Sequence, residues 1–153
     1  GTLVAREAVL QHLETATIVI KAAAVADYRA RHAASAKIKG KHDLTLELTP
    51  NADILAEVAA RRTGAFVVGF AAETNDVAAN ARAKLEAKGI DLLVANDVSR
   101  SGIGFDADDN EVLLLDRWGG ARPLPKMPKT AIADAILSHV LSLRTAAPRK
   151  TPA

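Results

Sequence analysis

Three short, mostly apolar runs of residues most constrain what this chain can fold into. They span residues 17–23, 65–71 and 90–95, and segments with helical periodicity lie between them. A strand that helices cover on both faces needs apolar side chains at consecutive positions, whereas a half-exposed strand alternates. The pattern therefore predicts an α/β fold, with a Rossmann-like, doubly wound, mostly parallel sheet and helices on both faces.

Four segments carry apolar residues at the spacing of a helix, and they span residues 1–16, 51–64, 74–89 and 129–143. Asn51 is the expected N-cap of the second helix, and Thr74 or Asn75 that of the third, which ends at Gly89. The first helix precedes every strand, although a helix of a parallel sheet normally connects it to an earlier strand. We therefore expect that one or more amino-terminal strands of the domain are missing from this sequence.

The segment between the first and second apolar runs has a different character. Residues 25–43 are rich in charge and show little periodicity, which predicts a long mobile loop of the kind that forms lids or binding loops. Residues 44–48 then alternate Leu with polar side chains, as in a half-buried strand at a sheet edge or in a separate ribbon. Pro50 is expected to end this strand.

The end of the chain is predicted to add a hairpin, a helix and a tail. Residues 111–116 and the turn at Gly119 and Gly120 indicate the hairpin, and the helix of residues 129–143 follows it. Residues 145–153 combine Pro and Ala with basic side chains, which predicts a disordered basic tail. The ordered domain is therefore expected to span residues 1–144.

Charge and composition exclude several kinds of partner. The 20 Lys and Arg nearly balance the 18 Asp and Glu, and aromatic residues are few, so nothing indicates binding to nucleic acid. The chain has no Cys for a thiolate metal site, and its four His lack partners at helical spacing, so no metal site is predicted. No apolar run approaches the ~18 residues of a membrane span. We expect a cytoplasmic domain that binds neither membrane nor nucleic acid.

Polar and small residues follow each of the three apolar runs, at residues 24–29, 71–75 and 96–99. The carboxyl ends of parallel strands lie along one edge of a sheet, so these turns should meet in one crevice, where ligands bind in such folds. Asp27 could bind a ligand there or cap its own loop, since Asp is common in turns. Glu73 and Asp97 could equally act as bases or as caps.

Lys84 and Lys88 are spaced four residues apart on the predicted third helix and therefore share one face of it. A solvated surface is one interpretation, because a cation such as Lys88 is favourable near a helix C-terminus. An anion clamp for phosphates is the other. Spacing alone leaves both open.

Four motifs together resemble a known family. They are Ala-Ala-Val-Ala-Asp-Tyr-Arg at residues 23–29, Lys-Ile-Lys at 37–39, Gly-Phe-Ala-Ala-Glu-Thr at 69–74 and Ala-Asn-Asp-Val at 95–98. In this order they are similar to the bacterial CTP-dependent phosphopantothenate-cysteine ligase, the carboxy-terminal domain of the bifunctional coenzyme A biosynthesis flavoprotein. The resemblance covers residues 1–143.

The resemblance implies a ligase of coenzyme A biosynthesis that uses CTP and Mg²⁺. Such an enzyme activates the carboxylate of 4'-phosphopantothenate as an acyl-cytidylate and releases pyrophosphate. The amine of cysteine then attacks, giving phosphopantothenoylcysteine and CMP. The resemblance also implies a homodimer, and a flavin-dependent decarboxylase domain that is fused to the ligase or associated with it.

By motif position, the resemblance also implies site residues. Lys37 matches a lysine of a flexible loop and is expected to be catalytic, closing over the substrate phosphate or the acyl-phosphate. The expected nucleotide contacts are Lys21, Ala22, Ala23, Asp27, Ala52, Asp53, Ile54, Leu55, Phe70, Lys84 and Lys88.

The chain departs from the family pattern in ways that bear on activity. Ala52 stands where the family commonly has Pro, and Gly40 where it commonly has Lys. The family's amino-terminal strand, its Gly-rich turn and the Asn and Ser-Ser-Gly motif that follow have no counterpart. We therefore expect weak ligase activity or none from this chain alone. The alternative is a non-catalytic dimerisation or interaction module with a residual nucleotide site, in which residues 44–48 pair across a two-fold axis.

Overall fold

The computed structural model describes residues 2–32, 37, 39–40, 43–98 and 108–146. Their helices and strands follow in the order α1 (Thr2–His12), β1 (Ile18–Lys21), β2 (Tyr28–Ala30), β3 (Leu48–Pro50), α2 (Ile54–Arg61), β4 (Phe66–Glu73), α3 (Val77–Lys88), β5 (Leu92–Asp97), β6 (Asp109–Asp116), β7 (Ala121–Pro128) and α4 (Lys129–Ala146). The Ser/Gly/Asp-rich segment 99–107 and most of the predicted tail, residues 147–153, lie outside the described residues.

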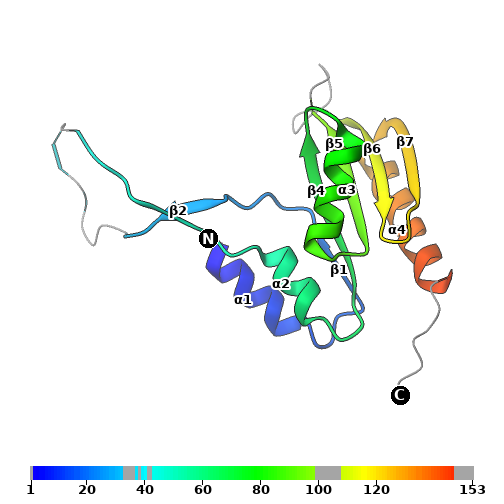
Figure 1. Cartoon of the computed structure of the whole chain (residues 1–153), viewed down its shortest axis with the longest axis horizontal. Coiled ribbons are helices and arrows are strands. Elements are labelled where there is room, and N and C mark those ends of the chain that lie inside the picture. Colours follow the sequence, from blue (N-terminus) through cyan, green and yellow to red (C-terminus); the bar gives the residue numbers. More distant parts are fainter. Residues whose placement is uncertain (1, 33–36, 38, 41–42, 99–107, 147–153) are drawn as a thin grey trace.

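A five-stranded sheet in the order β1-β4-β5-β6-β7 forms the centre of the fold (Figure 1). Strands β1, β4 and β5 are parallel, with Ile18 opposite Phe66 and Val68 opposite Leu92. The hairpin of β6 and β7 continues the sheet in antiparallel fashion beyond β5. The predicted Rossmann-like sheet and the predicted hairpin are both confirmed, because the three apolar runs are the parallel strands.

Helices cover both faces of this sheet, as predicted. On one face, α2 and α3 bury Leu55, Val58 and Leu85 against the side chains of β4 and β5. On the other face, α4 buries Ile132 and Ile136 in a second cluster. Helix α1 lies beside α2 (Figure 1) and contributes partly buried side chains to the first cluster. The alternation of strand faces thus produces two apolar layers with the sheet between them.

Two predicted helix caps are wrong. Helix α2 is capped by Asp53, whose Oδ1 accepts a hydrogen bond from the Ala56 N–H at 3.1 Å. Asn51 instead donates its side-chain amide to the Ala26 carbonyl at 2.7 Å. Helix α3 begins after Asp76, which has a left-handed backbone and makes no side-chain cap. Residues 74 and 75 lie between the end of β4 and this cap position, so neither is the N-cap of α3.

Strands β2 and β3 form a two-stranded antiparallel ribbon, which we call the arm together with the described residues between them, and it projects away from the sheet (Figure 1). The prediction of a structureless loop is therefore wrong where β2 forms, within residues 25–43. The separate ribbon is confirmed, but its strand begins at Leu48 rather than at residue 44. Leu44, Leu46 and Leu48 are 53%, 64% and 54% exposed, so the strand is not half-buried within this chain.

Gly69 lets α2 and β5 pack closely on β4. A Cβ at this position would lie 2.5 Å from Leu55 Cδ2 and 2.9 Å from Ile90 Cδ1, and both of these side chains are buried. We expect Gly69→Ala to lower the free energy of unfolding by about 1–3 kcal/mol, because the core must shift to admit the methyl group. Urea denaturation followed by circular dichroism measures this. An unchanged unfolding midpoint would show that the two side chains move aside freely.

None of the helices in the described part of the chain is long and apolar enough to cross a membrane.

Candidate functional site

A pocket of about 590 Å³ opens where β1, β4 and β5 end. The topology therefore brings the three strand ends together as predicted. The residues that line it are Lys21, Ala22, Ala23, Ala24, Val25, Asp27, Phe70, Ala71, Ala72, Lys84, Lys88, Leu93, Asn96, Asn110, Val112 and Lys129. Small residues at the ends of β1 and β4 leave the backbone accessible, while lysines supply positive charge.

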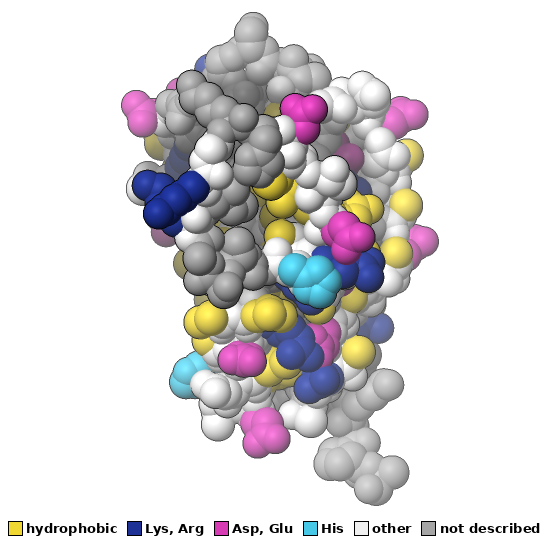
Figure 2. Space-filling model, turned by 90° about the vertical axis from the view of Figure 1, so that its left-hand side faces the viewer, with side chains coloured by type: hydrophobic (Ala, Val, Ile, Leu, Met, Phe, Trp, Pro, Cys, Tyr) yellow, Lys and Arg dark blue, Asp and Glu magenta, His cyan; other side chains and the backbone are white. Residues whose placement is uncertain are grey.

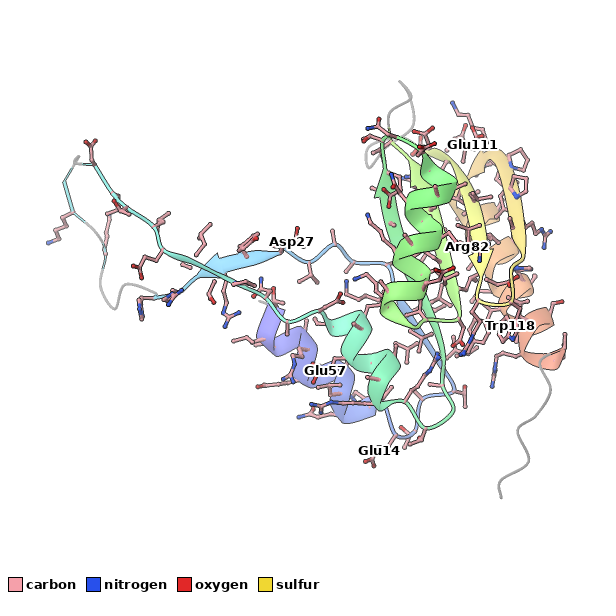
Figure 3. All side chains as sticks on the ribbon, viewed as in Figure 1. Glu14, Asp27, Glu57, Arg82, Glu111 and Trp118 are labelled. Carbon is pink, nitrogen blue, oxygen red and sulfur yellow. The ribbon has the colours of Figure 1, made fainter. Side chains whose placement is uncertain are left out.

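The segment after β1 forms one wall of the pocket. Lys21 is the last residue of the strand, and its Nζ donates to the Ala23 carbonyl at 3.1 Å. Asp27 directly precedes β2, at the base of the arm (Figure 3), and its carbonyl accepts a hydrogen bond from the Asn51 N–H at 2.7 Å. This backbone bond ties the arm's base to the segment that precedes α2. The Asp27 side chain remains at the pocket, so the ligand interpretation stays open.

Helix α3 forms a second wall through Lys84 and Lys88, and both lysines meet carboxylates. The Lys84 Nζ lies 2.6 Å from Glu73 Oε1, as an ion pair rather than a well-directed hydrogen bond. The Lys88 Nζ donates to Asp53 Oδ2 at 2.5 Å. The two lysines thus share the face of α3 that lines the pocket, where the Lys84 side chain is 46% exposed and that of Lys88 is 30% exposed. The solvated-surface and anion-clamp interpretations therefore both remain open at this point.

Asp53 is ionised at neutral pH. Partial burial raises the pKa of its carboxyl, but the hydrogen bond from Lys88, the backbone bonds from Ala56 and Leu55 and the Lys88 charge together outweigh burial. They hold the pKa of Asp53 below its usual range. Asp53 therefore serves as the N-cap of α2 and as the counter-charge of Lys88 at once.

The remaining predicted residues lie elsewhere. Ile54 and Leu55 are buried in the core and line a smaller, mostly apolar cavity of about 190 Å³ beside Ala22 and Ala23. Ala52 is not among the residues that line the pocket. Lys37 is exposed on the arm and does not line the pocket either. Seven of the predicted residues therefore line the pocket. Asp53 does not line it, but it forms an ion pair with Lys88, which does.

Asn110 and Lys129 also line the pocket but were missed from the sequence. Asn110 is near the start of β6, and Lys129 begins α4 directly after β7. The sequence could have indicated Asn110, because an antiparallel strand that follows β5 must begin at the edge of the sheet where β5 ends. Asn96 on β5 is a further lining residue, and its buried Oδ1 accepts no hydrogen bond from any residue that the structure describes.

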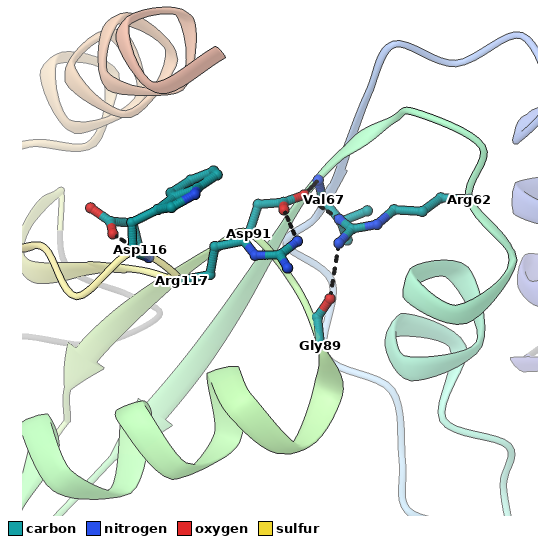
Figure 4. Close-up of polar contacts among 7 residues, drawn as sticks. Arg62, Val67, Gly89, Asp91, Asp116 and Arg117 are labelled. Carbon is teal, nitrogen blue, oxygen red and sulfur yellow. Dashed lines mark hydrogen bonds and ion pairs between the residues drawn. The ribbon is translucent and has the colours of Figure 1, made fainter. Parts of the chain in front are cut away.

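The opposite edge of the sheet holds a buried carboxylate with a structural role. Asp91 accepts hydrogen bonds from Arg62, from Arg117 and from the Val67 N–H, which lies 2.8 Å from Oδ2 (Figure 4). Arg62 also donates to the Gly89 carbonyl at 3.1 Å. This cluster joins the end of α2, the end of α3, strand β4 and the turn after β6. It lies away from the pocket.

No group of three or more His, Cys, Asp or Glu side chains in the described part of the chain could hold a metal ion.

Comparisons with known proteins place the chain among pantothenate-metabolism proteins. Residues 4–143 match the family model described as "DNA/pantothenate metabolism flavoprotein C-terminal domain". The chain is 45% identical over 140 residues to the coenzyme A biosynthesis bifunctional protein CoaBC of Bacillus subtilis, and 42% identical over 147 residues to that of Mycolicibacterium smegmatis. These alignments include 90% and 88% of this chain but 34% and 35% of the relatives. The chain thus spans about a third of their length.

Two solved structures share the fold. A crystal structure of the C-terminal domain of CoaBC aligns with a TM-score of 0.76 at 31% identity, covering 95% of this chain and 64% of that domain. The DNA/pantothenate metabolism flavoprotein from Streptococcus pneumoniae aligns with a TM-score of 0.76 at 18% identity, covering 93% of this chain and 70% of that one. The second likeness concerns the fold alone.

Proposed function

Because the chain belongs to the DNA/pantothenate metabolism flavoprotein C-terminal domain family, we propose that it forms part of a coenzyme A biosynthesis ligase that joins 4'-phosphopantothenate to cysteine. The observation that carries this proposal is the pocket at the carboxyl ends of the parallel strands, with Lys21, Lys84 and Lys88 in its walls. Anionic ligands bind at this edge in open α/β folds. CTP is the proposed nucleotide, and its triphosphate would meet the three lysines.

The proposed chemistry demands positioning and charge stabilisation more than a covalent enzyme intermediate. The carboxylate of 4'-phosphopantothenate attacks the α-phosphorus of CTP, and the bond to the β-phosphate breaks to release pyrophosphate. The cysteine nitrogen then attacks the acyl carbon, the bond from that carbon to the phosphate oxygen breaks, and the amine loses a proton. Lysine ammonium groups at the pocket would stabilise the negative charge on the phosphates in both steps.

Mg²⁺ is proposed to enter with the triphosphate. This ion usually keeps several waters and is held by substrate phosphates with one or two carboxylates, rather than by a cage of protein ligands. Asp27 is the carboxylate that lines the pocket and fits this role. Phe70, 39% exposed at the pocket, is an apolar surface on which a nucleoside could lie.

Lys37 is proposed to act from the arm. It is exposed and stands outside the set of lining residues in this structure, so it could reach a bound substrate only if the arm moves. Closure of such a segment over a substrate is common in enzymes and excludes water from the reaction. The catalytic role of Lys37 therefore depends on a conformational step.

A calorimetric titration of this chain with CTP and Mg²⁺, run beside ATP, tests the nucleotide site. We expect CTP to bind and ATP to bind more weakly. Equal binding of both nucleotides would contradict the proposed base preference, and no binding of either by a folded sample would contradict the site. The complete ligase activity, and a flavin-dependent decarboxylase fused to it or associated with it, are proposed only for a longer protein that would include this chain, because this chain spans about a third of the length of its relatives.

The arm favours a second candidate function, assembly into a homodimer. Leu44, Leu46 and Leu48 lie exposed on it together with Tyr28, which is 59% exposed. Figure 2 looks onto this end of the molecule, where hydrophobic side chains lie exposed among charged ones. A thin ribbon with free edges and exposed leucines is suited to pair with its counterpart in a second copy across a two-fold axis.

Leu46→Glu tests this assembly. We expect the unchanged protein to be a dimer by light scattering and the variant to be monomeric, because the charge would be buried in the interface without a partner. Leu141→Glu is the matched control, since Leu141 is also exposed but lies on α4. A dimer that survives in Leu46→Glu, or that both variants disrupt equally, would contradict a specific role for the arm.

A further inference from the structure

The two lysines of α3 differ in how firmly their carboxylates are held. The Glu73 side chain is 8% exposed, whereas that of Asp53 is 49% exposed. Glu73 is the last residue of β4, where its backbone pairs with Asp97 and its carbonyl accepts from the Val98 N–H at 3.0 Å. Its carboxylate therefore sits on a fixed backbone and faces away from water.

This difference in burial decides what each lysine can do when a polyanion arrives. If Lys88 turns to a phosphate, the half-exposed Asp53 can be solvated by water and keeps its bond from the Ala56 N–H. If Lys84 left Glu73, the buried Glu73 carboxylate would lose its ion-pair partner among the described residues. An unpaired buried charge is strongly unfavourable. Lys84 must therefore stay with Glu73, whereas Lys88 is free to exchange partners.

We propose that Glu73 is a positioning residue of the pocket: it holds the Lys84 ammonium at one place at the wall, both before and after a polyanion binds. Glu73 does not line the pocket itself, so it acts through Lys84 rather than on the ligand. The N–H bonds of the ammonium that do not face Glu73 are available to phosphate oxygens. The identity of the polyanion as CTP rests on the proposed function, but the anchoring of Lys84 does not.

Nuclear magnetic resonance of protein labelled with ¹⁵N-lysine tests this directly, because an ammonium held in an ion pair gives a resolved ¹H–¹⁵N signal and a freely hydrated one exchanges its protons too fast. Lys84→Met assigns the signal by its loss. We expect the Lys84 signal in the unchanged protein, its loss in Glu73→Gln, and its retention in Glu86→Gln. Glu86 is the matched control, as an exposed acid on the same helix that does not line the pocket.

Titration with CTP and Mg²⁺ then tests the bound state. The Lys84 signal should shift but persist, whereas the Lys88 signal should change as its partner changes. Loss of the Lys84 signal on binding would overturn the proposal, and so would its absence from the unchanged protein or its persistence in Glu73→Gln. If CTP shifts no lysine signal but the ligand-free results are as expected, the proposed nucleotide function is overturned. The proposal that Glu73 holds Lys84 is then still supported.

Stability supplies an independent check. Lys84→Met should lower the urea midpoint markedly, because Glu73 is left buried without its cation. The double variant Glu73→Gln, Lys84→Met should recover most of that loss. A double variant no more stable than Lys84→Met would overturn the proposal, because Glu73 would then not depend on Lys84.

Discussion

Replacing Asp91 by Ala is expected to lower the free energy of unfolding by about 3–5 kcal/mol, a large part of the stability of a domain of this size. Asp91 is buried, and its carboxylate is bonded to Arg62, Arg117 and the Val67 N–H. Its removal leaves the Arg62 guanidinium, itself only 14% exposed, with the Gly89 carbonyl as its remaining hydrogen-bond partner among the described residues. The loss is large because a mostly buried cation is left without its counter-ion.

Urea denaturation of Asp91→Ala and of Asp134→Ala measures this effect. Asp134 is exposed on α4, so the same change of side chain there should alter stability by no more than about 0.5 kcal/mol. Because the Asp91 cluster lies at the opposite edge from the pocket, the folded fraction of Asp91→Ala should still bind CTP. A loss below about 1 kcal/mol would show that the cluster is solvated and contributes little.

Replacing Lys88 by Ala is expected to weaken CTP binding by about 10- to 100-fold, because a hydrogen bond to a charged group contributes about 1.5–3 kcal/mol and 1.4 kcal/mol corresponds to tenfold. Lys88 lines the pocket, and the carboxylate that it would leave behind belongs to Asp53, which is half-exposed. The variant should therefore remain about as stable as the unchanged protein. Replacing Lys88 therefore tests the site more directly than replacing Lys84, because the loss of Lys84 also leaves the buried Glu73 carboxylate without its ion-pair partner.

Calorimetry at constant salt compares Lys88→Ala with Lys126→Ala, which removes an exposed lysine of β7 outside the pocket. The affinity of Lys126→Ala for CTP should change less than twofold. Because screening by salt weakens exposed ionic contacts, the difference between the two variants should shrink as salt is raised. Equal affinities of the two variants would remove Lys88 from the proposed site.

Local patterns sufficed to predict the sheet and the place of the pocket. Mostly apolar runs without alternation identify the three parallel strands, since strands covered on both faces need them. Parallel order then places their carboxyl ends together, whatever the details of packing. For the same reason, the position of Asp27 after the first run assigns it to this edge of the sheet. The family motifs, rather than position along a strand, indicated Lys21 and Phe70, and all three residues line the pocket.

Features that depend on distant partners could not be predicted in this way. Strand β2 is only three exposed residues, and it becomes a strand because residues 48–50 pair with it. Asn51 is a residue type that commonly caps helices, but its side-chain amide donates to the carbonyl of Ala26, and Asp53 caps the helix instead. Such choices are settled by competition between a local bond and a long-range one.

The sequence by itself determined the periodicity of each strand and helix, the edge at which the strands end and the family motifs. Only the tertiary structure decided which charges are neutralised and which are buried: that Lys84 meets Glu73, that Lys88 meets Asp53 and that the arm's leucines stay exposed. The physical reason is that side-chain periodicity follows from local backbone geometry, whereas burial and ion pairing depend on the arrangement of segments far apart in the chain.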